Sequence, residues 1–317
     1  MNILLTGAAG YIGSHVARLL KQGGHSVFGA DDLSTGLAPR FDGPIEHVDL
    51  AAADGVDRLK ASFVANSIEA VVHLAARKQV GESVEKPEWY FSQNVGGLAN
   101  LLTAMRETNV QKLLFSSSAA VYGMPDAPVI TEDIHCQPIN PYGETKLIGE
   151  WLVADAGRAW GLKHVSLRYF NVAGAGWSDL ADTAVANLIP IAFAAIRAGK
   201  PVRVFGDDYP TADGSCVRDY IHVLDLAKAH QSALEYLDQP NREHAVFNVG
   251  TGVGASVFEV IAEIKKQTGL DFEVSVESRR AGDPPKLSAD VSRIRQSLNW
   301  QAEHDLANIV SSAWQAN

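Results

Sequence analysis

The sequence predicts an α/β protein built on a doubly wound parallel sheet, with a smaller second lobe. Short apolar and β-branched runs alternate with amphipathic segments of helix length over the first 170 of the 317 residues. This alternation is typical of βαβ units. A glycine-rich turn follows the first run and opens a helix. After about residue 171 Pro190, Pro201 and Pro210 interrupt shorter runs, which predicts the second lobe.

The expected strands are the most apolar of these runs. Parallel strands buried on both faces are almost continuously apolar, and Ala70 to Leu74 and Lys112 to Phe115 come close to this pattern. In the second lobe we expect shorter strands at 202–205 and 245–249. In the main sheet we expect strands near residues 2–6, 26–31, 45–49, 70–75, 112–117 and 164–170.

Composition and charge exclude several classes of protein. Apolar residues make up 46% and charged residues 20% of the chain, which is a globular composition and not a disordered one. The net charge of −10 argues against nucleic-acid binding, which needs a basic face. Since no apolar window approaches the roughly 20 residues of a membrane-spanning helix, we expect a soluble protein.

We also expect a cytoplasmic protein without a metal site. The first residues, Met1 to Gly7, show no basic leader followed by an apolar run and a cleavage site. Cys136 and Cys216 lie far apart and have no metal-ligand spacing, so they are expected to be free thiols. The ten histidines show no ligand spacing either.

Three glycines, Gly7, Gly10 and Gly13, form the turn after the first strand. The first permits a tight turn, the second lets the backbone approach a pyrophosphate, and the third lets helix and strand pack closely. The phosphates would lie over the N-terminus of the following helix. Because strand, loop, helix and second strand occur in order, we interpret the turn as the phosphate loop of a Rossmann-like dinucleotide-binding domain.

The end of the second strand indicates which dinucleotide is bound. Asp31 stands where an acidic side chain accepts hydrogen bonds from the adenosine ribose hydroxyls. NAD is favoured over NADP, because a 2′-phosphate would face both Asp31 and Asp32. No arginine follows closely in the sequence to offset that repulsion, Arg40 being the nearest.

We therefore expect residues 1–170 to form an NAD-binding domain and residues 171–317 to form mainly a substrate-binding lobe. The boundary stays open, because segments between 217 and 250 could return to the first domain. In open α/β sheets, ligands bind beyond the carboxyl ends of the strands. The active site is therefore expected between the two parts.

Tyr142 and Lys146 stand four residues apart at an expected helix start, where Pro141 suits the first position. A tyrosine titrates at about 10, and a nearby cation lowers that pKa so that the phenolate can act as a base. Ser118 closes the run Ser116 to Ser118 at the end of the fifth strand, where its hydroxyl can bind a substrate hydroxyl. Serine, tyrosine and lysine together form a proton-transfer set.

Along essentially its whole length the chain resembles the extended short-chain dehydrogenase/reductase superfamily and, within it, the UDP-glucose 4-epimerases. The resemblance implies an NAD-dependent isomerase that acts on a UDP-sugar and keeps its NAD bound, regenerating it in each turnover. Besides the loop and the tyrosine–lysine pair, the matching segments are VGESV at 80–84, SSSAAVYG at 116–123, RYFN at 168–171 and GDDYPTADGSCVRDYIHV at 206–223.

The resemblance also implies which residues hold the ligands. The expected NAD-binding residues are Gly7, Gly10, Tyr11, Ile12, Gly13, Asp31, Asp32, Leu33, Ser34, Thr35, Gly36, Asp49, Leu50, Leu74, Ala75, Ala76, Arg77, Lys78, Asn94, Tyr142, Lys146 and Phe170. Ser118 and Tyr142 would meet the sugar. The UDP part would be held by Asn171, Asn187, Leu188, Arg203, Val204, Phe205, Arg218 and the stretch Arg280 to Asp283.

Arg218 and Arg280 are the expected partners of the diphosphate, because an acidic protein needs fixed donors for that anion. In the implied mechanism Tyr142 takes the proton of the sugar 4-hydroxyl while C4 passes a hydride to NAD. The 4-keto sugar then turns about its diphosphate linkage and receives the hydride on its other face. The configuration at C4 is thereby inverted.

One position departs from the pattern of bacterial galactose-type enzymes. Leu287 stands where such epimerases often carry a tyrosine beside the sugar 2-substituent. A leucine leaves room for an N-acetyl group, so N-acetylated UDP-hexoses are alternative substrates. UDP-pentoses and UDP-uronates also stay open, because related 4-epimerases share the same long loop signature.

Two further classes are alternatives to an epimerase. A nucleotide-sugar 4,6-dehydratase, which is a lyase, typically places Asp-Glu after a threonine at the end of the fifth strand, whereas here Ala119 and Ala120 follow Ser118. A non-enzymatic NAD(P)-sensing protein is expected to lose Tyr142 or Lys146, and both are present. The epimerase interpretation is therefore preferred.

A homodimer is expected from the resemblance. Trp151 and Trp160 lie on the predicted helix of Tyr142. The outer face of that helix, with the helix around residues 88–107, would pack against a second subunit.

Overall fold

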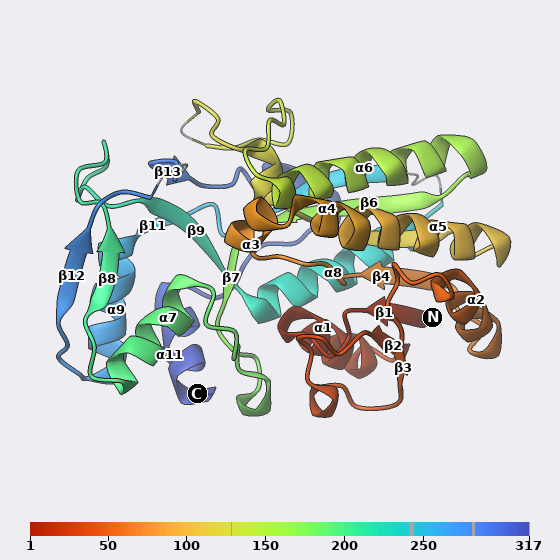
Figure 1. Ribbon diagram of the computed structural model, residues 1–317, viewed down its shortest axis with the longest axis horizontal. Helices are drawn as coiled ribbons and strands as arrows, with labels where there is room; N and C mark the ends of the chain where they lie inside the picture. Colours follow the sequence, from red (N-terminus) through yellow and green to blue (C-terminus); the bar gives the residue numbers. More distant parts are fainter. Residues whose placement is uncertain (128, 241–243, 281–282, 317) are drawn as a thin grey trace. The chain divides into compact units, whose positions relative to one another are not determined.

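The chain divides into two compact units, each described by itself below (Figure 1). The computed structural model describes residues 1–127, 129–240, 244–280 and 283–316. The first unit comprises Met1–Gly123, His135–Arg168 and Ala227–Phe247, and the second comprises Met124–Ile134, Tyr169–Leu226 and Asn248–Asn317. The last segment of the first unit falls within residues 217–250, whose assignment the sequence leaves open. The strand expected at 245–249 in the second lobe instead pairs with the strand at 163–169 at the edge of the first unit's sheet, a pairing that local sequence patterns do not specify.

The described part of the first unit is built on a seven-stranded sheet with the order β10-β6-β5-β4-β1-β2-β3. Thr6, the last residue of β1, is in parallel register with Ala30 of β2 and His73 of β4. The strand order runs outward in both directions from β1 and β4, so the topological switch point lies between these two strands. The strands are β1 (Asn2–Thr6), β2 (Ser26–Asp31), β3 (Ile45–His47), β4 (Ala70–His73), β5 (Lys112–Ser118), β6 (Lys163–Tyr169) and β10 (His244–Val249).

Helices cover both faces of this sheet, which confirms the predicted doubly wound fold (Figure 1). On one face Phe63 of α2 (Gly55–Ala65), Met105 of α5 (Gly97–Glu107) and Val153 of α6 (Pro141–Trp160) form a core with the strand residues Leu4 and Leu113. On the other face lie α1 (Tyr11–Gln22) and α8 (Val223–Asp238). Shorter elements are η1 (Ala38–Arg40), α3 (Val80–Glu85) and η3 (Ala119–Tyr122).

The helix expected around residues 88–107 is interrupted. It consists of α4 (Pro87–Tyr90), the π-helical segment η2 (Phe91–Gly96) and α5. Within the π segment the buried Asn94 turns its side chain toward Thr145 of α6. Such segments occur frequently at functional sites, because the extra residue re-aims a side chain. Hydrophobic periodicity does not reveal this insertion.

The second unit contains small sheets and flanking helices. In its described residues β9 pairs with β7, β11 and β13, and β8 pairs with β12. Phe193 of α7, Ile264 of α9 and Val310 of α11 pack together in its core. The elements are β7 (Asn171–Ala173), η4 (Ser178–Leu180), α7 (Leu188–Arg197), β8 (Val202–Phe205), β9 (Val217–His222), β11 (Gly254–Ser256), α9 (Val257–Thr268), β12 (Val274–Glu277), β13 (Lys286–Leu287), α10 (Ser292–Leu298) and α11 (Leu306–Ala316).

Two smaller expectations concern the whole chain. Cys136 and Cys216 are free thiols, as predicted. None of the helices in the described ranges has the length and apolar composition that a membrane crossing demands.

Candidate active site

The glycine loop is packed so tightly that side chains would not fit. Gly7 has a φ of +72°, and a Cβ atom there would lie 2.8 Å from the backbone nitrogen of Ala75. A Cβ atom at Gly13 would lie only 2.0 Å from the carbonyl oxygen of Gly7. Helix α1 therefore begins directly against the loop, with Gly10 as its N-cap. Its N-terminus carries the partial positive charge that suits a phosphate.

Asp31 lies behind this loop at the end of β2. Its carboxylate accepts hydrogen bonds from the backbone N–H groups of Ala9 at 2.9 Å and Leu33 at 2.8 Å. Burial raises the pKa of Asp31, and the two backbone donors offset part of that rise. A Cβ atom at Gly36 would lie 3.0 Å from the same carboxylate. The glycine cradle and an acidic group at the strand end fit a dinucleotide.

The remaining expected cofactor residues of this unit follow β3 and β4. Asp49 accepts a hydrogen bond from the backbone of Ala51 at 2.9 Å, and Leu50 is buried. Leu74, Ala75, Ala76, Arg77 and Lys78 form the loop after β4. Asn94 holds this loop: its side chain accepts from Arg77 N at 2.8 Å and donates to Arg77 O at 3.0 Å. Asn94 also donates to Thr145 Oγ1 at 3.0 Å, which ties the loop to α6.

The loop after β2 corrects one inference from the sequence. Asp32 does have a nearby arginine, because Arg77 Nη2 lies 2.6 Å from its Oδ2 atom. Residues Leu33, Ser34 and Thr35 continue this loop, and Leu33 has a φ of +54°. Arg77 is distant in the sequence but follows a strand only two positions away in the sheet.

Tyr142, Lys146 and Ser118 come together as predicted, on α6 and at the end of β5. The Ser118 side chain lies beside the Tyr142 hydroxyl and lowers the pKa of the tyrosine. Lys146 Nζ donates to the carbonyl oxygen of Ser116 at 2.8 Å and lies 6.0 Å from the centroid of the Tyr142 ring. Asn140 caps the helix by accepting from Gly143 N at 2.9 Å, which fixes the tyrosine in the first turn.

Burial dominates the protonation of this set. It raises the pKa of Tyr142, and the Ser118 hydrogen bond offsets part of the rise. Burial lowers the pKa of Lys146 to about 7. Without additional positive charge, Tyr142 therefore stays protonated at neutral pH. A phenolate needs the charged form of Lys146 or another cation close by.

A buried pair, Glu150 and Arg168, supports the three serines at the end of β5. This pair was not assigned a role from the sequence. Glu150 lies one helical turn after Lys146, accepts a short hydrogen bond from Ser117 Oγ and forms an ion pair with Arg168. Arg168 also donates to the Tyr122 hydroxyl at 2.9 Å. Burial alone would lower the pKa of Arg168, but the bond to Glu150 and its charge raise it overall. The spacing of Tyr142, Lys146 and Glu150 on one helix face was the available signal.

The expected UDP-binding residues all lie in the second unit, where β9 and β13 form one group. Leu287 of β13 is in register with Arg218 of β9. Arg218 donates to the carbonyl oxygen of Pro284 at 2.7 Å and lies 3.4 Å from the Asp283 carboxylate. The Arg218 guanidinium is thus aimed along the segment that leads to Leu287.

A second group surrounds Phe205 at the end of β8. The guanidinium of Arg280 lies 4.0 Å from the Phe205 ring centroid and that of Arg203 lies 5.7 Å from it. The two groups are connected, because Asp283 N donates to the carbonyl oxygen of Arg280 at 3.4 Å. Ala281 and Gly282, within the expected stretch, lie outside the described residues.

The other expected residues of the second unit occupy strand and helix starts. Phe170 is buried and its backbone N–H donates to Val249 O at 3.2 Å. Asn171 begins β7, while Asn187 precedes the first residue of α7, Leu188. Val204 points into the core of the unit.

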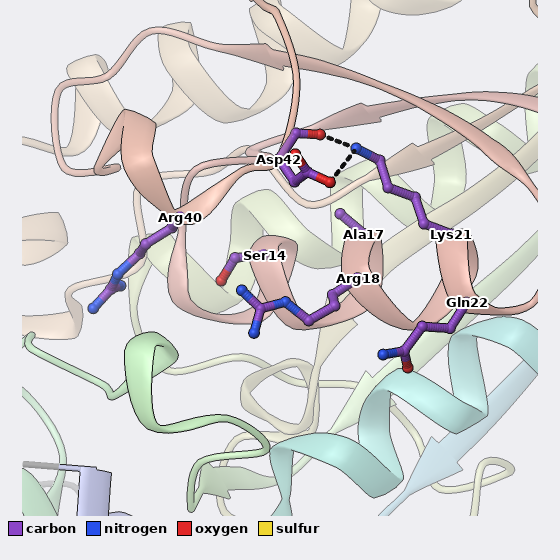
Figure 2. A pocket seen from close by; sticks show the side chains of 7 residues that line it. All are labelled: Ser14, Ala17, Arg18, Lys21, Gln22, Arg40 and Asp42. Carbon is purple, nitrogen blue, oxygen red and sulfur yellow. Dashed lines mark hydrogen bonds and ion pairs between the residues drawn. The ribbon is translucent and has the colours of Figure 1, made fainter.

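One hollow on the first unit is separate from these residues. It has a volume of about 410 Å³ and is shown in Figure 2. Lys21 closes one side through contacts with the carbonyl and carboxylate groups of Asp42. Arg40, the arginine nearest to Asp31 in the sequence, lines this hollow. The lining residues are Ser14, Ala17, Arg18, Lys21, Gln22, Arg40 and Asp42.

The fold and the glycine loop define a protein of the dinucleotide-binding class, in which a serine, a tyrosine and a lysine lie together at the end of β5 and the start of α6. The model of the NAD dependent epimerase/dehydratase family matches residues 3–250. The chain belongs to this family. The resemblance to the UDP-glucose 4-epimerases is also confirmed, because the UDP-glucose 4-epimerase of Corynebacterium glutamicum is 43% identical over 99% of this chain and 95% of its own length.

Solved structures agree with this placement. The UDP-glucose 4-epimerase from Stenotrophomonas maltophila with bound NAD and formylated UDP-arabinopyranose is similar with a TM-score of 0.94 and 40% identity, over 100% of this chain and 97% of that one. The UDP-Glc/GlcNAc 4-epimerase from Campylobacter jejuni is similar with a TM-score of 0.86 and 41% identity, over 99% and 98%. These enzymes cover this chain from end to end.

Proposed function

We propose that this protein is an NAD-dependent epimerase that inverts C4 of a UDP-sugar, with UDP-glucose and UDP-galactose as its main pair of substrates. The observation that carries this proposal is the placement of Tyr142 beside Ser118 and one helical turn before the buried Lys146, whose Nζ atom donates to the Ser116 carbonyl oxygen. Full-length relatives that are named UDP-glucose 4-epimerase support the same conclusion.

The first unit supplies the groups that would hold NAD. The cradle formed by Gly7, Gly10 and Gly13 suits the diphosphate, and Asp31 suits the adenosine ribose. A bound nicotinamide supplies reversible hydride transfer at the sugar C4 carbon. The packed glycines support this role, since a Cβ atom at Gly7 or Gly13 would displace the backbone that forms the cradle.

The proton chemistry belongs to the residues of α6 and β5. The Tyr142 oxygen takes the proton from the sugar 4-hydroxyl and later returns it to the oxygen of the 4-keto group, while the hydride returns to the opposite face of C4. Ser118 donates to that oxygen and positions the hydroxyl that reacts. Lys146, held by the Ser116 carbonyl group, stabilises the phenolate by its charge.

The second unit supplies the groups that would anchor the UDP part. Arg218 and Arg280 are fork-shaped donors suited to a diphosphate. Anchoring at the nucleotide leaves the 4-keto sugar free to turn about its diphosphate linkage. Each face of C4 can then be presented in turn, which inversion requires.

Leu287 favours a second group of substrates. A leucine leaves more room beside the sugar 2-substituent than the tyrosine that bacterial galactose-type enzymes often carry, so we include UDP-N-acetylhexosamines in the proposal. The UDP-Glc/GlcNAc 4-epimerase from Campylobacter jejuni, which is 41% identical to this chain, supports this breadth of substrates. UDP-pentoses and UDP-uronates are the next substrates to test.

The test is an assay of the purified protein without added cofactor. UDP-galactose is supplied in one tube and UDP-N-acetylgalactosamine in another, and the C4 epimers are separated and quantified. Turnover that Tyr142→Phe abolishes supports the epimerase and its retained NAD. If neither sugar turns over, even with NAD added, the UDP-hexose assignment is wrong, and release of water from the sugar would indicate the dehydratase alternative.

We also propose that the enzyme is a cytoplasmic homodimer that uses α5 and the outer face of α6. Trp151 on α6 is 59% exposed, whereas Trp160 packs partly against the core. A large exposed aromatic side chain on a helix face is typical of a subunit contact. A monomeric mass by light scattering at micromolar concentration would contradict the dimer.

A further inference from the structure

The two loops that carry Asp32 and Arg77 lie on either side of the glycine loop. Strand β1 stands between β2 and β4 in the sheet. Neighbouring strands are roughly 4.8 Å apart, so the ends of β2 and β4 are about 10 Å apart. The side chain of Arg77, together with that of Asp32, bridges this distance. It connects the loop after β4 with the loop after β2, across the end of β1 that leads into the phosphate loop.

Four side chains hold the guanidinium of Arg77. Its Nη2 atom donates to Asp32 Oδ2 at 2.6 Å and to Gln93 Oε1 at 3.1 Å, and its Nη1 atom makes a short bond to Ser34 Oγ. The guanidinium also lies 4.8 Å from the ring centroid of Trp89. The Arg77 side chain is 17% exposed and that of Asp32 is 29% exposed. This ion pair is thus partly desolvated, which makes it stronger than an exposed one.

Both ends of the connection are fixed to their loops. Asp32 Oδ1 accepts from the Ser34 backbone at 3.0 Å and from Ser34 Oγ at 2.6 Å. The backbone of Arg77 is held at both its N–H and its C=O by Asn94. Opening the ion pair therefore separates two ordered loops, and it does not simply release two flexible side chains.

We propose that the Arg77–Asp32 ion pair is a clasp that slows the release of bound NAD. A dinucleotide over the glycine loop, with its ribose at Asp31, lies in the crevice that the two loops flank. This inference rests on the proposed function, because an epimerase regenerates NAD in every turnover and has no need to exchange it. A dehydrogenase would be slowed by such a clasp, whereas an epimerase is not.

The experiment measures the release of NAD from the holoenzyme. Wild type, Arg77→Met, Asp32→Asn and the double variant are purified with NAD bound and diluted into an auxiliary alcohol dehydrogenase with excess alcohol. That enzyme reduces released NAD to a fluorescent product while it oxidises the alcohol. We expect each single variant to release NAD about threefold to tenfold faster. The double variant should resemble the singles, because either change opens the same clasp.

A matched ion pair serves as the control. Lys60 of α2 and Glu107 of α5 lie 2.7 Å apart on the same unit, with 34% and 42% exposure of their side chains. Lys60→Met should release NAD at the wild-type rate. The melting temperatures of the NAD-free proteins separate a loss of stability from a loss of retention, and Arg77→Lys should restore part of the slow release.

The outcomes distinguish the clasp from the proposed function. Wild-type release rates in both single variants, or equal acceleration in Lys60→Met, would overturn the clasp. The clasp would be supported, and the proposed substrate contradicted, if the variants release NAD faster than the wild type as expected but the wild type converts no UDP-sugar.

Discussion

Arg168 and Glu150 form a two-point ion pair inside the first unit. Arg168 Nε donates to Glu150 Oε1 at 2.8 Å and Nη2 donates to Oε2 at 2.6 Å. Each side chain is only 7% exposed. Because Glu150 also binds Ser117, between Ser116 and Ser118, the pair fixes the end of β5 from behind.

Replacement of Glu150 by glutamine should therefore destabilise the protein strongly. We expect the free energy of unfolding to fall by about 3–5 kcal/mol, since the Arg168 charge stays buried without its counterion. Urea unfolding of the NAD-free protein measures this change. Asp155→Asn is the control on the same helix, because its ion pair with Arg158 is 62% and 73% exposed, and it should cost less than about 1 kcal/mol. Equal losses in the two variants would show that the buried pair has no special role.

The burial of Lys146, which the proposed catalysis requires, should lower the stability of the folded protein. Its pKa falls from 10.5 to about 7 because of burial, so the unfolded chain binds this proton more tightly than the folded one. The penalty is complete below pH 7 and disappears as the pH rises toward 10.5. We expect Lys146→Met to abolish turnover but to raise the free energy of unfolding by roughly 1–3 kcal/mol at pH 6.

Urea unfolding at pH 6 and pH 9.5 tests this prediction on the NAD-free proteins. The gain from Lys146→Met should shrink at the higher pH. Lys266→Met, at a side chain that is 70% exposed, should show no such dependence. A gain that is equal at both pH values would contradict the assigned cause.

The buried His73 should make the first unit sensitive to acid. Its Nδ1 atom lies 2.8 Å from Thr6 Oγ1, and its ring stacks on Phe115. Burial, with a contribution from the Lys146 charge, lowers the pKa of His73 to about 3. The unfolded chain binds a proton at His73 below pH 6.5, so stability is lost as the pH falls from 6.5 toward 3.

We expect His73→Gln to reduce the loss in the free energy of unfolding between pH 6.5 and pH 3 by roughly 2–4 kcal/mol. Unfolding of the NAD-free protein in urea at a series of pH values gives the slope, whatever the variant's stability at pH 7. His135→Gln, at an exposed position, is the control and should keep the wild-type slope. A variant at position 73 with the wild-type slope would assign the acid sensitivity to other groups.

Leu287 should decide how large a sugar 2-substituent is accepted. We expect Leu287→Tyr to lower kcat/KM for UDP-N-acetylgalactosamine by about tenfold or more, with little effect on UDP-galactose, because a larger ring occupies the space beside C2. Steady-state kinetics on both sugars measure the ratio. A wild-type enzyme that refuses N-acetylated sugars, or an unchanged ratio in the variant, would remove Leu287 as a specificity determinant.

The sequence predicted the fold closely because its signals are local. Strands β1 and β2 lie at the expected residues, and β3 to β6 differ by one or two residues at their ends. Strand β10 was expected in the second lobe, but it joins the main sheet beside β6. The glycine loop and the Tyr142–Lys146 spacing are also local patterns. Each could be interpreted from a few consecutive residues.

What the sequence did not reveal depends on partners that are distant in the chain. Arg77 meets Asp32 only because their strands flank β1, and Glu150 meets Arg168 only because α6 packs on the sheet. Arg40 is the arginine nearest to the acidic pair in the sequence, yet it lines the hollow of Figure 2, and Arg77 is the arginine that meets Asp32. Such pairs require the strand order, which hydrophobic patterns do not specify.

The π-helical segment η2 changes the helical phase between α4 and α5. Each residue of an α-helix advances about 100° around the axis, and the wider turn of η2 accommodates an additional residue. The residues before Asn94 and those after it therefore point their inner faces in different directions. One continuous coil can thus direct Trp89 and Asn94 toward the Arg77 loop and Met105 toward the core of the sheet. Deletion of a single residue from η2 would keep the coil helical but would rotate Asn94 away from the Arg77 loop that it holds.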